Sequence, residues 1–393
     1  MMKKMDFPSL ALLNTISHFP KIAAIDLGTN SCRLVIALVD ITSLHRNFFK
    51  GKLEQYNNNM RVIDSFAKIV GLGELIKQTG VLSKDAIERT VSALYICKKK
   101  LEQNYISKMR AVATEACRQA KNSHVLLEKV KEETEIELEI IPPKEEARLV
   151  LKGCSGVISE KKKYGILLDI GGGSTEVVWL RVNGTESNKL ISVIDSMSLP
   201  YGIVTLNDTY SHNNSDPTVY SIAQQSISQL MQFFMAKNRI KSLLKKDMVQ
   251  IITSSGTVTT FGSLVLGMKY YHRNFVDGKE FKSENIIDVG KDLLARYLLN
   301  SSNNVLAKGE TGGLSGYVEQ LNMKDLKYFT HYRMGLLASG AVIINSVLDS
   351  IGSCAIKIAD RGVREGILYD IVDEIKNEQS VSWEKDWKRK KNY

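Results

Sequence analysis

The chain has 393 residues and a formal net charge of +10, a length that exceeds one ordinary hydrophobic core, so we expect two globular domains. Aromatic residues make up 7% of the sequence without a basic, base-stacking stretch, the five cysteines form no Cys-x-x-Cys pair, and no apolar stretch approaches membrane-spanning length. These features indicate a cytoplasmic protein that has neither a nucleic-acid partner nor a membrane partner. The six histidines form no zinc motif, so any catalytic metal is expected to have oxygen ligands.

The order of apolar runs, caps and turns predicts alternating strands and helices. After a loose lead-in at 1–20, we expect strands at 22–26 and 34–38, a helix at 83–104, a strand at 109–113, a helix at 114–133 and a strand at 135–141. Pro142 and Pro143 close this last strand. Beyond them we expect strands at 166–168 and 177–180, a helix at 220–244, a strand at 249–252, mainly helical segments, and a solvated basic tail at 385–391.

One short motif occurs twice. Asp26-Leu-Gly-Thr-Asn-Ser31 recurs 143 residues later as Asp169-Ile-Gly-Gly-Gly-Ser174, and both copies lie between two β-rich runs. A Rossmann turn would open a helix and a Walker loop would end in Gly-Lys-Ser or Gly-Lys-Thr, and neither pattern is present at these turns. The interval is too long for a solenoid, so it predicts the duplication of a domain. We therefore expect an α/β fold with domains at 21–145 and 146–358, and a C-terminal helix with a basic tail at 359–393 that packs on the first domain.

Both turns are candidates for binding phosphate. Glycine lets the backbone approach an anion closely, and successive N–H groups in a tight turn form a positive nest for phosphate oxygens. Either turn alone is more often an ordinary glycine hairpin, but the pair favours a phosphate clamp. The candidate residues are Asp26, Gly28, Thr29, Asn30 and Ser31 in the first turn, and Gly171, Gly172, Gly173, Ser174 and Thr175 in the second.

Carboxylates at these turns point to a metal ion. Asp26 and Asp169 end buried-looking strands, where a lone carboxylate is costly unless it bonds its own turn or faces a cation. The residues alone allow both roles, a turn cap and a ligand of phosphate-bound magnesium. Glu176 lies seven residues after Asp169 on the outgoing strand, where it could share the same ion through hard oxygen ligation.

Two further charged residues are candidates for catalysis. Glu145 and Glu146 begin a helix, where acidic residues interact favourably with the helix dipole. The alternative is that Glu146 points into the cleft and polarises a water for attack on the terminal phosphorus. Arg118 occupies the first turns of a helix, where a guanidinium could grip a phosphate, although a surface arginine is the default interpretation.

Four linked motifs resemble the exopolyphosphatase/guanosine pentaphosphate phosphatase family. They are Ala24 to Leu34, Ala113 to Asn122, Glu145 to Leu149 and Leu168 to Glu176, and the resemblance extends through Ala359 to Leu368. It implies the actin-like ATPase fold, in which two RNase H-like α/β domains flank an active-site cleft. The sequence looks like the short form of the family, without the helical C-terminal extension. Pro142 and Pro143 depart from the Ser-Gly turn of many relatives, a difference that bears on the placement of Glu146.

Carried over by position, the resemblance assigns roles to single residues. Glu146 resembles the general base, and Arg118 matches an arginine that contacts phosphate. Asp169 and Glu176 match the acidic residues that hold Mg²⁺, for which Mn²⁺ is the alternative. The nucleoside side of the cleft would be formed by Ser255, Gly256 and Thr257.

The sequence therefore predicts a phosphoanhydride hydrolase that releases terminal orthophosphate from polyphosphate, from guanosine pentaphosphate, or from both. Its partner is a polyanionic phosphate substrate, and a homodimer is the commonest form of self-association. An ATP-dependent kinase or ATPase on the same scaffold is the first alternative. A sensor that binds polyphosphate or a nucleotide without turnover is the second.

Overall fold

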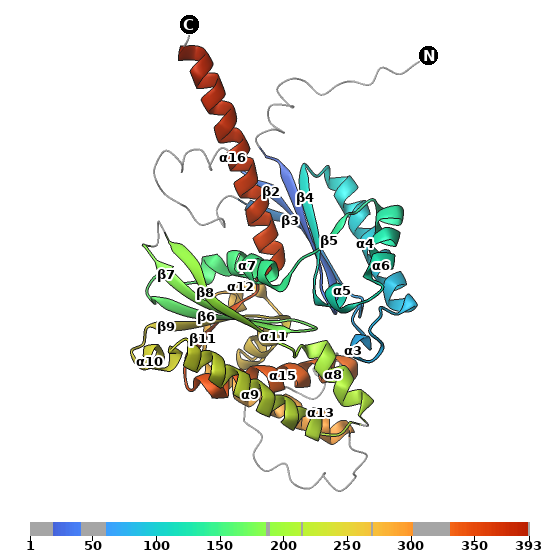
Figure 1. Ribbon diagram of the computed structural model, residues 1–393, viewed down its shortest axis with the longest axis vertical. Coiled ribbons are helices and arrows are strands. Elements are labelled where there is room, and N and C mark those ends of the chain that lie inside the picture. Colours follow the sequence, from blue (N-terminus) through green and yellow to red (C-terminus); the bar gives the residue numbers. More distant parts are fainter. Residues whose placement is uncertain are drawn as a thin grey trace.

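The computed structural model describes residues 19–40, 60–185, 189–213, 215–268, 270–301 and 331–391. All but the last two residues of the expected lead-in at 1–20 lie outside these ranges. Figure 1 shows two β-sheets, one above the other in this view, with helices on their outer faces and further helices between them.

The first sheet contains five strands in the order β3-β2-β1-β4-β5. The central strand β1 pairs antiparallel with β2 and parallel with β4, so a hairpin meander on one side meets parallel strands on the other. The strands are β1 (Lys21–Leu27), β2 (Ser31–Val39), β3 (Met60–Ile69), β4 (Lys108–Ala113) and β5 (Leu138–Ile140). The helices of this half are α3 (Ile76–Thr79), α4 (Lys84–Asn104), α5 (Glu115–Gln119) and α6 (Ser123–Thr134).

Read from the matching edge, the order of the second sheet is β8-β7-β6-β9-β11-β10. It repeats the order of the first sheet and adds β10 at the end. Its central strand β6 again pairs antiparallel with the next strand in the chain and parallel with β9. The strands are β6 (Tyr164–Ile170), β7 (Thr175–Asn183), β8 (Leu190–Leu199), β9 (Val249–Ser254), β10 (Glu280–Lys282) and β11 (Ala355–Ala359). The repeated order confirms the predicted α/β fold with two related sheets, while the domain limits stay a prediction.

Most helices of the second half cover the outer face of the second sheet. They are α8 (Ile203–His212), α9 (Thr218–Lys237), α10 (Ile240–Lys245), α11 (Gly256–Val265), α12 (Arg273–Val276), α13 (Ser283–Ser301) and α15 (His331–Ile351). Two more helices, α7 (Pro143–Cys154) and α16 (Val363–Lys391), lie between the sheets (Figure 1). A short 3-10 turn, Ser155–Val157, follows α7.

The two helices between the sheets belong to a core that both sheets share. Their buried side chains form one apolar cluster with Val35 and Val112 of the first sheet and Val178 and Ile252 of the second. The helices cross so closely that a Cβ atom on Gly366 of α16 would lie 2.0 Å from the carbonyl oxygen of Leu149 in α7. Because backbone meets backbone at this point, α7 and α16 pack against each other as one unit.

Replacing Gly366 by alanine is therefore expected to lower the free energy of unfolding by about 1–3 kcal/mol, because the added methyl must push the helices apart. The better helix propensity of alanine offsets only part of this loss. Chemical denaturation followed by circular dichroism measures the difference. Gln225→Ala, at an exposed position of α9, serves as the control and should change stability by less than about 0.5 kcal/mol.

Several predicted elements have different limits. The helix expected at 114–133 is interrupted between α5 and α6, where the Asn122 side chain accepts a hydrogen bond from the backbone N–H of Leu82 at 2.8 Å. The helix expected at 220–244 is split by Arg239, whose φ of 54° is left-handed. The strand expected at 135–141 shortens to β5, and the expected basic tail at 385–391 is the end of α16.

The prediction that no segment is long and apolar enough to cross a membrane was wrong. By length and composition, Tyr332–Ile351 in α15 would suffice. However, 78% of this window is buried, and its side chains pack in the core of the second half beneath the sheet. The composition of α15 therefore matches a central core helix.

Candidate active site

The repeated motif forms two hairpins with the same internal hydrogen bond. In the first, the N–H of Gly28 donates to the carbonyl oxygen of Ser31 at 3.0 Å, and in the second, the N–H of Gly171 donates to the carbonyl oxygen of Ser174 at 3.0 Å. The carbonyl oxygen of Gly172 also accepts from the backbone N–H of Val204, at the start of α8, at 2.9 Å. The internal bonds fix the shape of both turns, and the bond from Val204 also holds the second turn against the start of α8.

The two hairpins touch each other at the floor of a cleft. A Cβ atom on Gly172 would lie 2.9 Å from the Cβ of Thr29, and one on Gly173 would lie 2.8 Å from the Thr29 hydroxyl oxygen. Thr29 itself is buried. A side chain at Gly172 or Gly173 would therefore hold the turns apart, whereas one at Gly171 would lie 3.1 Å from the carbonyl oxygen of Ser174 in its own turn.

The cleft between the sheets has a volume of about 390 Å³ and is lined by residues of both halves. Predicted site residues that line it are Asp26, Gly28, Thr29, Asn30, Ser31, Glu146, Asp169, Gly171, Gly172, Gly173, Ser174, Ser255, Gly256 and Thr257. The side-chain oxygen of Asn30 is buried without a hydrogen-bond partner in the structure. Arg118, Thr175 and Glu176 lie behind this lining. The Thr175 hydroxyl donates to the carbonyl oxygen of Tyr201 at 2.7 Å.

Asp169 and Glu176 form a directly opposed pair on the antiparallel strands β6 and β7. Opposed residues of such a pair share one face of the sheet, so the two carboxylates are neighbours. Burial, and then the nearby charge of Glu176, raises the pKa of Asp169 to about 7. Burial also raises the pKa of Glu176, although hydrogen bonds from Ser174 at 2.7 Å and Ser198 at 3.0 Å oppose this effect.

Among the residues that the structure describes, no group of three or more His, Cys, Asp or Glu side chains could hold a metal ion. The pair of Asp169 and Glu176 nevertheless fits the way proteins bind Mg²⁺, through one or two carboxylates together with substrate phosphates and water. Burial is the main cause of both raised pKa values, and the charge of Glu176 adds to it at Asp169, so ionising both carboxylates is costly without a cation. A divalent cation would offset this cost.

Glu146 lies in the first turn of α7 and is buried beside the cleft. Its Oε2 atom accepts a hydrogen bond from Arg118 at 2.7 Å, and Arg118 also donates to Glu115 at 2.6 Å. Burial and the charge of Glu176 raise the pKa of Glu146 to about 8, against the opposing effect of Arg118. The predicted contact of Arg118 with phosphate stays a prediction, because in this structure its guanidinium binds the two glutamates.

The first hairpin carries the opposite charge at the position equivalent to Glu176. Asp26 is paired across β1 and β2 with Arg33, seven residues later. Burial raises the pKa of Asp26, while Arg33 and Arg364 lower it. A Cβ atom on Gly256, at the start of α11, would lie 3.6 Å from the Arg33 guanidinium, so Arg33 extends across the cleft.

The sequence analysis missed several charged residues of the cleft. The missed residues are Arg33, Lys68, Glu115, Arg333, Asp360, Arg361 and Arg364. The internal repeat could have indicated Arg33, because it stands where the second copy has Glu176. Glu115 and the residues from Asp360 onwards lie within motifs of the resemblance. Lys68 and Arg333 had no signal in the sequence.

Two related α/β halves, two touching glycine hairpins and a buried carboxylate pair define a phosphate-handling enzyme with a cleft between its domains. The chain belongs to the Ppx/GppA phosphatase family, whose family profile matches residues 53–375. This membership confirms the predicted family and the predicted enzyme class.

Relatives and solved structures agree with this assignment. The chain is 27% identical over 356 residues to a bifunctional 3-dehydroquinate synthase/phosphatase of Fusobacterium nucleatum, covering 89% of the chain but only 46% of that protein. It is 28% identical to exopolyphosphatase 2 of Mycobacterium tuberculosis, over 70% of the chain and 80% of that protein. The crystal structure of an Aquifex aeolicus member of the Ppx/GppA family matches with a TM-score of 0.61 and 25% identity, over 91% of the chain and 99% of that structure. This match confirms the actin-like arrangement of the two halves.

Proposed function

We propose that this protein hydrolyses the terminal phosphoanhydride bond of inorganic polyphosphate, of guanosine pentaphosphate, or of both, releasing orthophosphate. One observation carries the proposal: the two glycine hairpins touch in a single cleft that Glu146 and Asp169 also line. A chain of phosphates can therefore bind to the backbone amides of both hairpins. Its terminal phosphate would then lie near Glu146, the proposed base, and Asp169, a proposed metal ligand.

In this mechanism the hairpins and Ser31 and Ser174 bind the phosphate oxygens, and Arg118 neutralises charge near the terminal group. Glu146 accepts a proton from a water molecule and orients it for in-line attack on the terminal phosphorus. Asp169 and Glu176 would hold Mg²⁺ or Mn²⁺, which would stabilise the charge that develops on the phosphate oxygens. The leaving group is the shortened phosphate chain, and no covalent intermediate with the protein is needed.

Five cations line the cleft together with as many acidic residues, and the placement of the cations supports a substrate with more than one phosphate. Arg33, Lys68, Arg333, Arg361 and Arg364 line the same cavity as the hairpins. Their spread beyond the two turns favours an extended polyanion over a single phosphate ester. The start of α11, with Ser255, Gly256 and Thr257, adds a helix N-terminus to this surface, where anions are stabilised.

Phosphate release from three substrates tests the proposal. Polyphosphate, guanosine pentaphosphate and ATP are incubated separately with the protein, with Mg²⁺ and with a chelator. We expect Mg²⁺-dependent release from polyphosphate or guanosine pentaphosphate. Release from ATP alone would support the kinase or ATPase alternative, and binding without any release would support a sensor.

Arg118 should set the pH dependence of this reaction. Glu146 must be ionised to accept a proton, so kcat/KM rises with pH through the pKa of this group. Because Arg118 lowers that pKa, Arg118→Met should raise it and move the rise in rate to higher pH. We expect the deficit in kcat/KM of this variant to be about three- to tenfold larger at about pH 7 than at about pH 9. Equal deficits at both pH values would mean that Arg118 acts on the substrate alone.

A further inference from the structure

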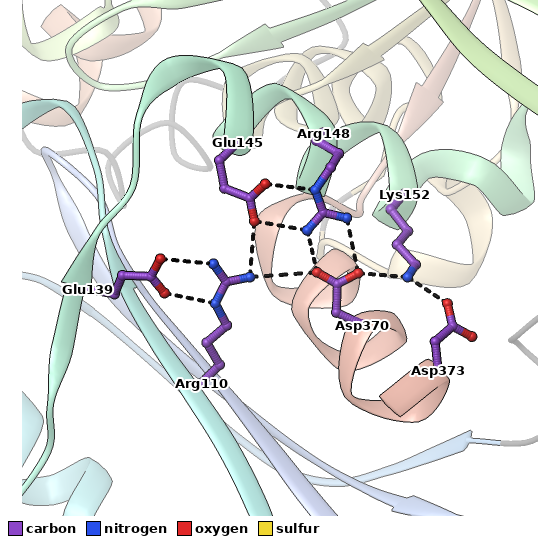
Figure 2. A network of polar contacts seen from close by, with 7 residues as sticks. All are labelled: Arg110, Glu139, Glu145, Arg148, Lys152, Asp370 and Asp373. Atoms are coloured by element: carbon purple, nitrogen blue, oxygen red, sulfur yellow. Dashed lines mark hydrogen bonds and ion pairs between the residues drawn. The ribbon is translucent and has the colours of Figure 1, made fainter. Parts of the chain in front are cut away.

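A network of charged side chains surrounds α7 outside the lining of the cleft. Figure 2 shows that it joins strands β4 and β5 to the helices α7 and α16. Its members are Arg110 on β4, Glu139 on β5, Glu145, Arg148 and Lys152 on α7, and Asp370 and Asp373 on α16.

Asp370 is the centre of this network. Its carboxylate accepts hydrogen bonds from both terminal nitrogens of Arg148 and from Lys152, the latter at 2.6 Å, and Arg110 lies 3.6 Å away. The Asp370 side chain is only 15% exposed. Burial alone would raise its pKa, but the bonds from Arg148 and Lys152 lower it below the usual value. Asp370 therefore stays charged and binds cations of two elements at once.

The network holds the residue next to the proposed base. Glu145 accepts hydrogen bonds from Arg148 at 2.7 Å and from Arg110 at 3.1 Å, and Arg110 in turn pairs with Glu139 through two bonds. Glu146 follows directly in the first turn of α7, lines the cleft and accepts a hydrogen bond from Arg118. The first turn of α7 is thus held through both Glu145 and Glu146.

A role in stability alone explains this arrangement poorly. The network is only partly buried, with the Arg148 side chain 46% exposed, and ion pairs at such positions add little to stability. The best-attested use of such groups is to fix the register of one element against another. Here, the elements are α7, which carries Glu146, and α16, whose first residues line the cleft. A slide or rotation of α7 along α16 would move Glu146 relative to Asp169.

We propose that Asp370 is a positioning residue, which acts through Arg148 and Glu145 to place Glu146 at the distance from the metal-binding pair that water attack requires. This inference rests on the proposed function of Glu146. A misplacement of about 1 Å can cost about 100-fold in rate, so a small shift of α7 has a large effect.

Asp370→Asn, which keeps the shape but removes the charge, should lower kcat by about 10- to 100-fold and change KM by less than about twofold. Arg148→Gln should also lower kcat. Because Arg148 is half-exposed, this second variant should fold even if Asp370→Asn does not. Asp64→Asn removes a two-oxygen contact with Lys100 far from α7 and should leave kcat unchanged. Unchanged kcat in both Asp370→Asn and Arg148→Gln, or a change confined to KM, would overturn the proposal.

A double-mutant cycle separates positioning from general destabilisation. If Asp370 acts through Glu146, Asp370→Asn should have almost no further effect on kcat in a Glu146→Gln background. Full additivity of the two losses would show that Asp370 acts elsewhere and would refute the proposal. Melting temperatures measured on the same variants show how much of each loss reflects unfolded protein.

Crystal structures provide a test that does not need turnover. In Asp370→Asn, the Cα atom of Glu146 should move by about 0.5–1 Å relative to that of Asp169, whereas Asp64→Asn should leave it in place. An unmoved Glu146 would reject the positioning role. If the wild type released no phosphate from any substrate, the proposed function would fail, and this distance would still decide whether Asp370 places α7.

Discussion

Replacing Glu146 by glutamine is expected to lower kcat for polyphosphate by about 10³-fold while the protein still binds the substrate. Glutamine has nearly the same volume, and its side-chain oxygen can still accept the hydrogen bond that Arg118 donates at 2.7 Å. It cannot accept a proton from water at neutral pH. The loss should therefore fall on the chemical step and leave the cleft intact. Orthophosphate release measures kcat, and isothermal titration with polyphosphate measures binding.

A matched substitution tests whether this loss is specific. Glu88→Gln removes the same charge from α4, where Glu88 pairs with Lys129 on the surface. This variant should keep the wild-type kcat. If Glu146→Gln retained more than about a tenth of the wild-type kcat, Glu146 would not be the base, and the raised pKa of its carboxyl would reflect only its burial and the charge of Glu176.

The hairpins could be predicted because their determinants are local. Each turn combines a small-residue motif with an apolar run on either side. Neither feature depends on contacts with distant parts of the chain. The break between α5 and α6 depends instead on Asn122, whose side chain bonds the backbone of Leu82 forty residues away. No local pattern contains that partner. For the same reason, the split at Arg239 could not be read from an otherwise helical run.

The site shows the same division between local and distant determinants. The catalytic candidates near the hairpins came from motifs, and the structure brings Glu146, Asp169 and both turns to one cleft. Lys68 comes from the edge strand β3, and Arg333 comes from the core helix α15. Neither residue has a neighbour in the sequence that marks it as functional. Only the packing of the two halves places these cations opposite the turns.

Asp169→Asn is expected to lower kcat/KM by about 10³-fold, equivalent to about 4 kcal/mol of transition-state stabilisation. The amide keeps the shape of the side chain but removes one of the two opposed carboxylates that would hold the metal ion. The Mg²⁺ concentration that gives half-maximal activity should rise in the same variant. A titration of phosphate release against Mg²⁺ measures both effects.

The internal duplication supplies the control, because Asp26 occupies the same place in the first hairpin. Asp26 faces Arg33 across the strands where Asp169 faces Glu176, so its carboxylate already has a cation beside it. Asp26→Asn should therefore lower kcat/KM by only about 10- to 100-fold and leave the Mg²⁺ requirement unchanged. Equal losses in the two variants, with equal shifts in the Mg²⁺ requirement, would show that the metal bridges both hairpins. In that case the two aspartates would have the same role, and only Arg33 and Glu176 would distinguish the two hairpins.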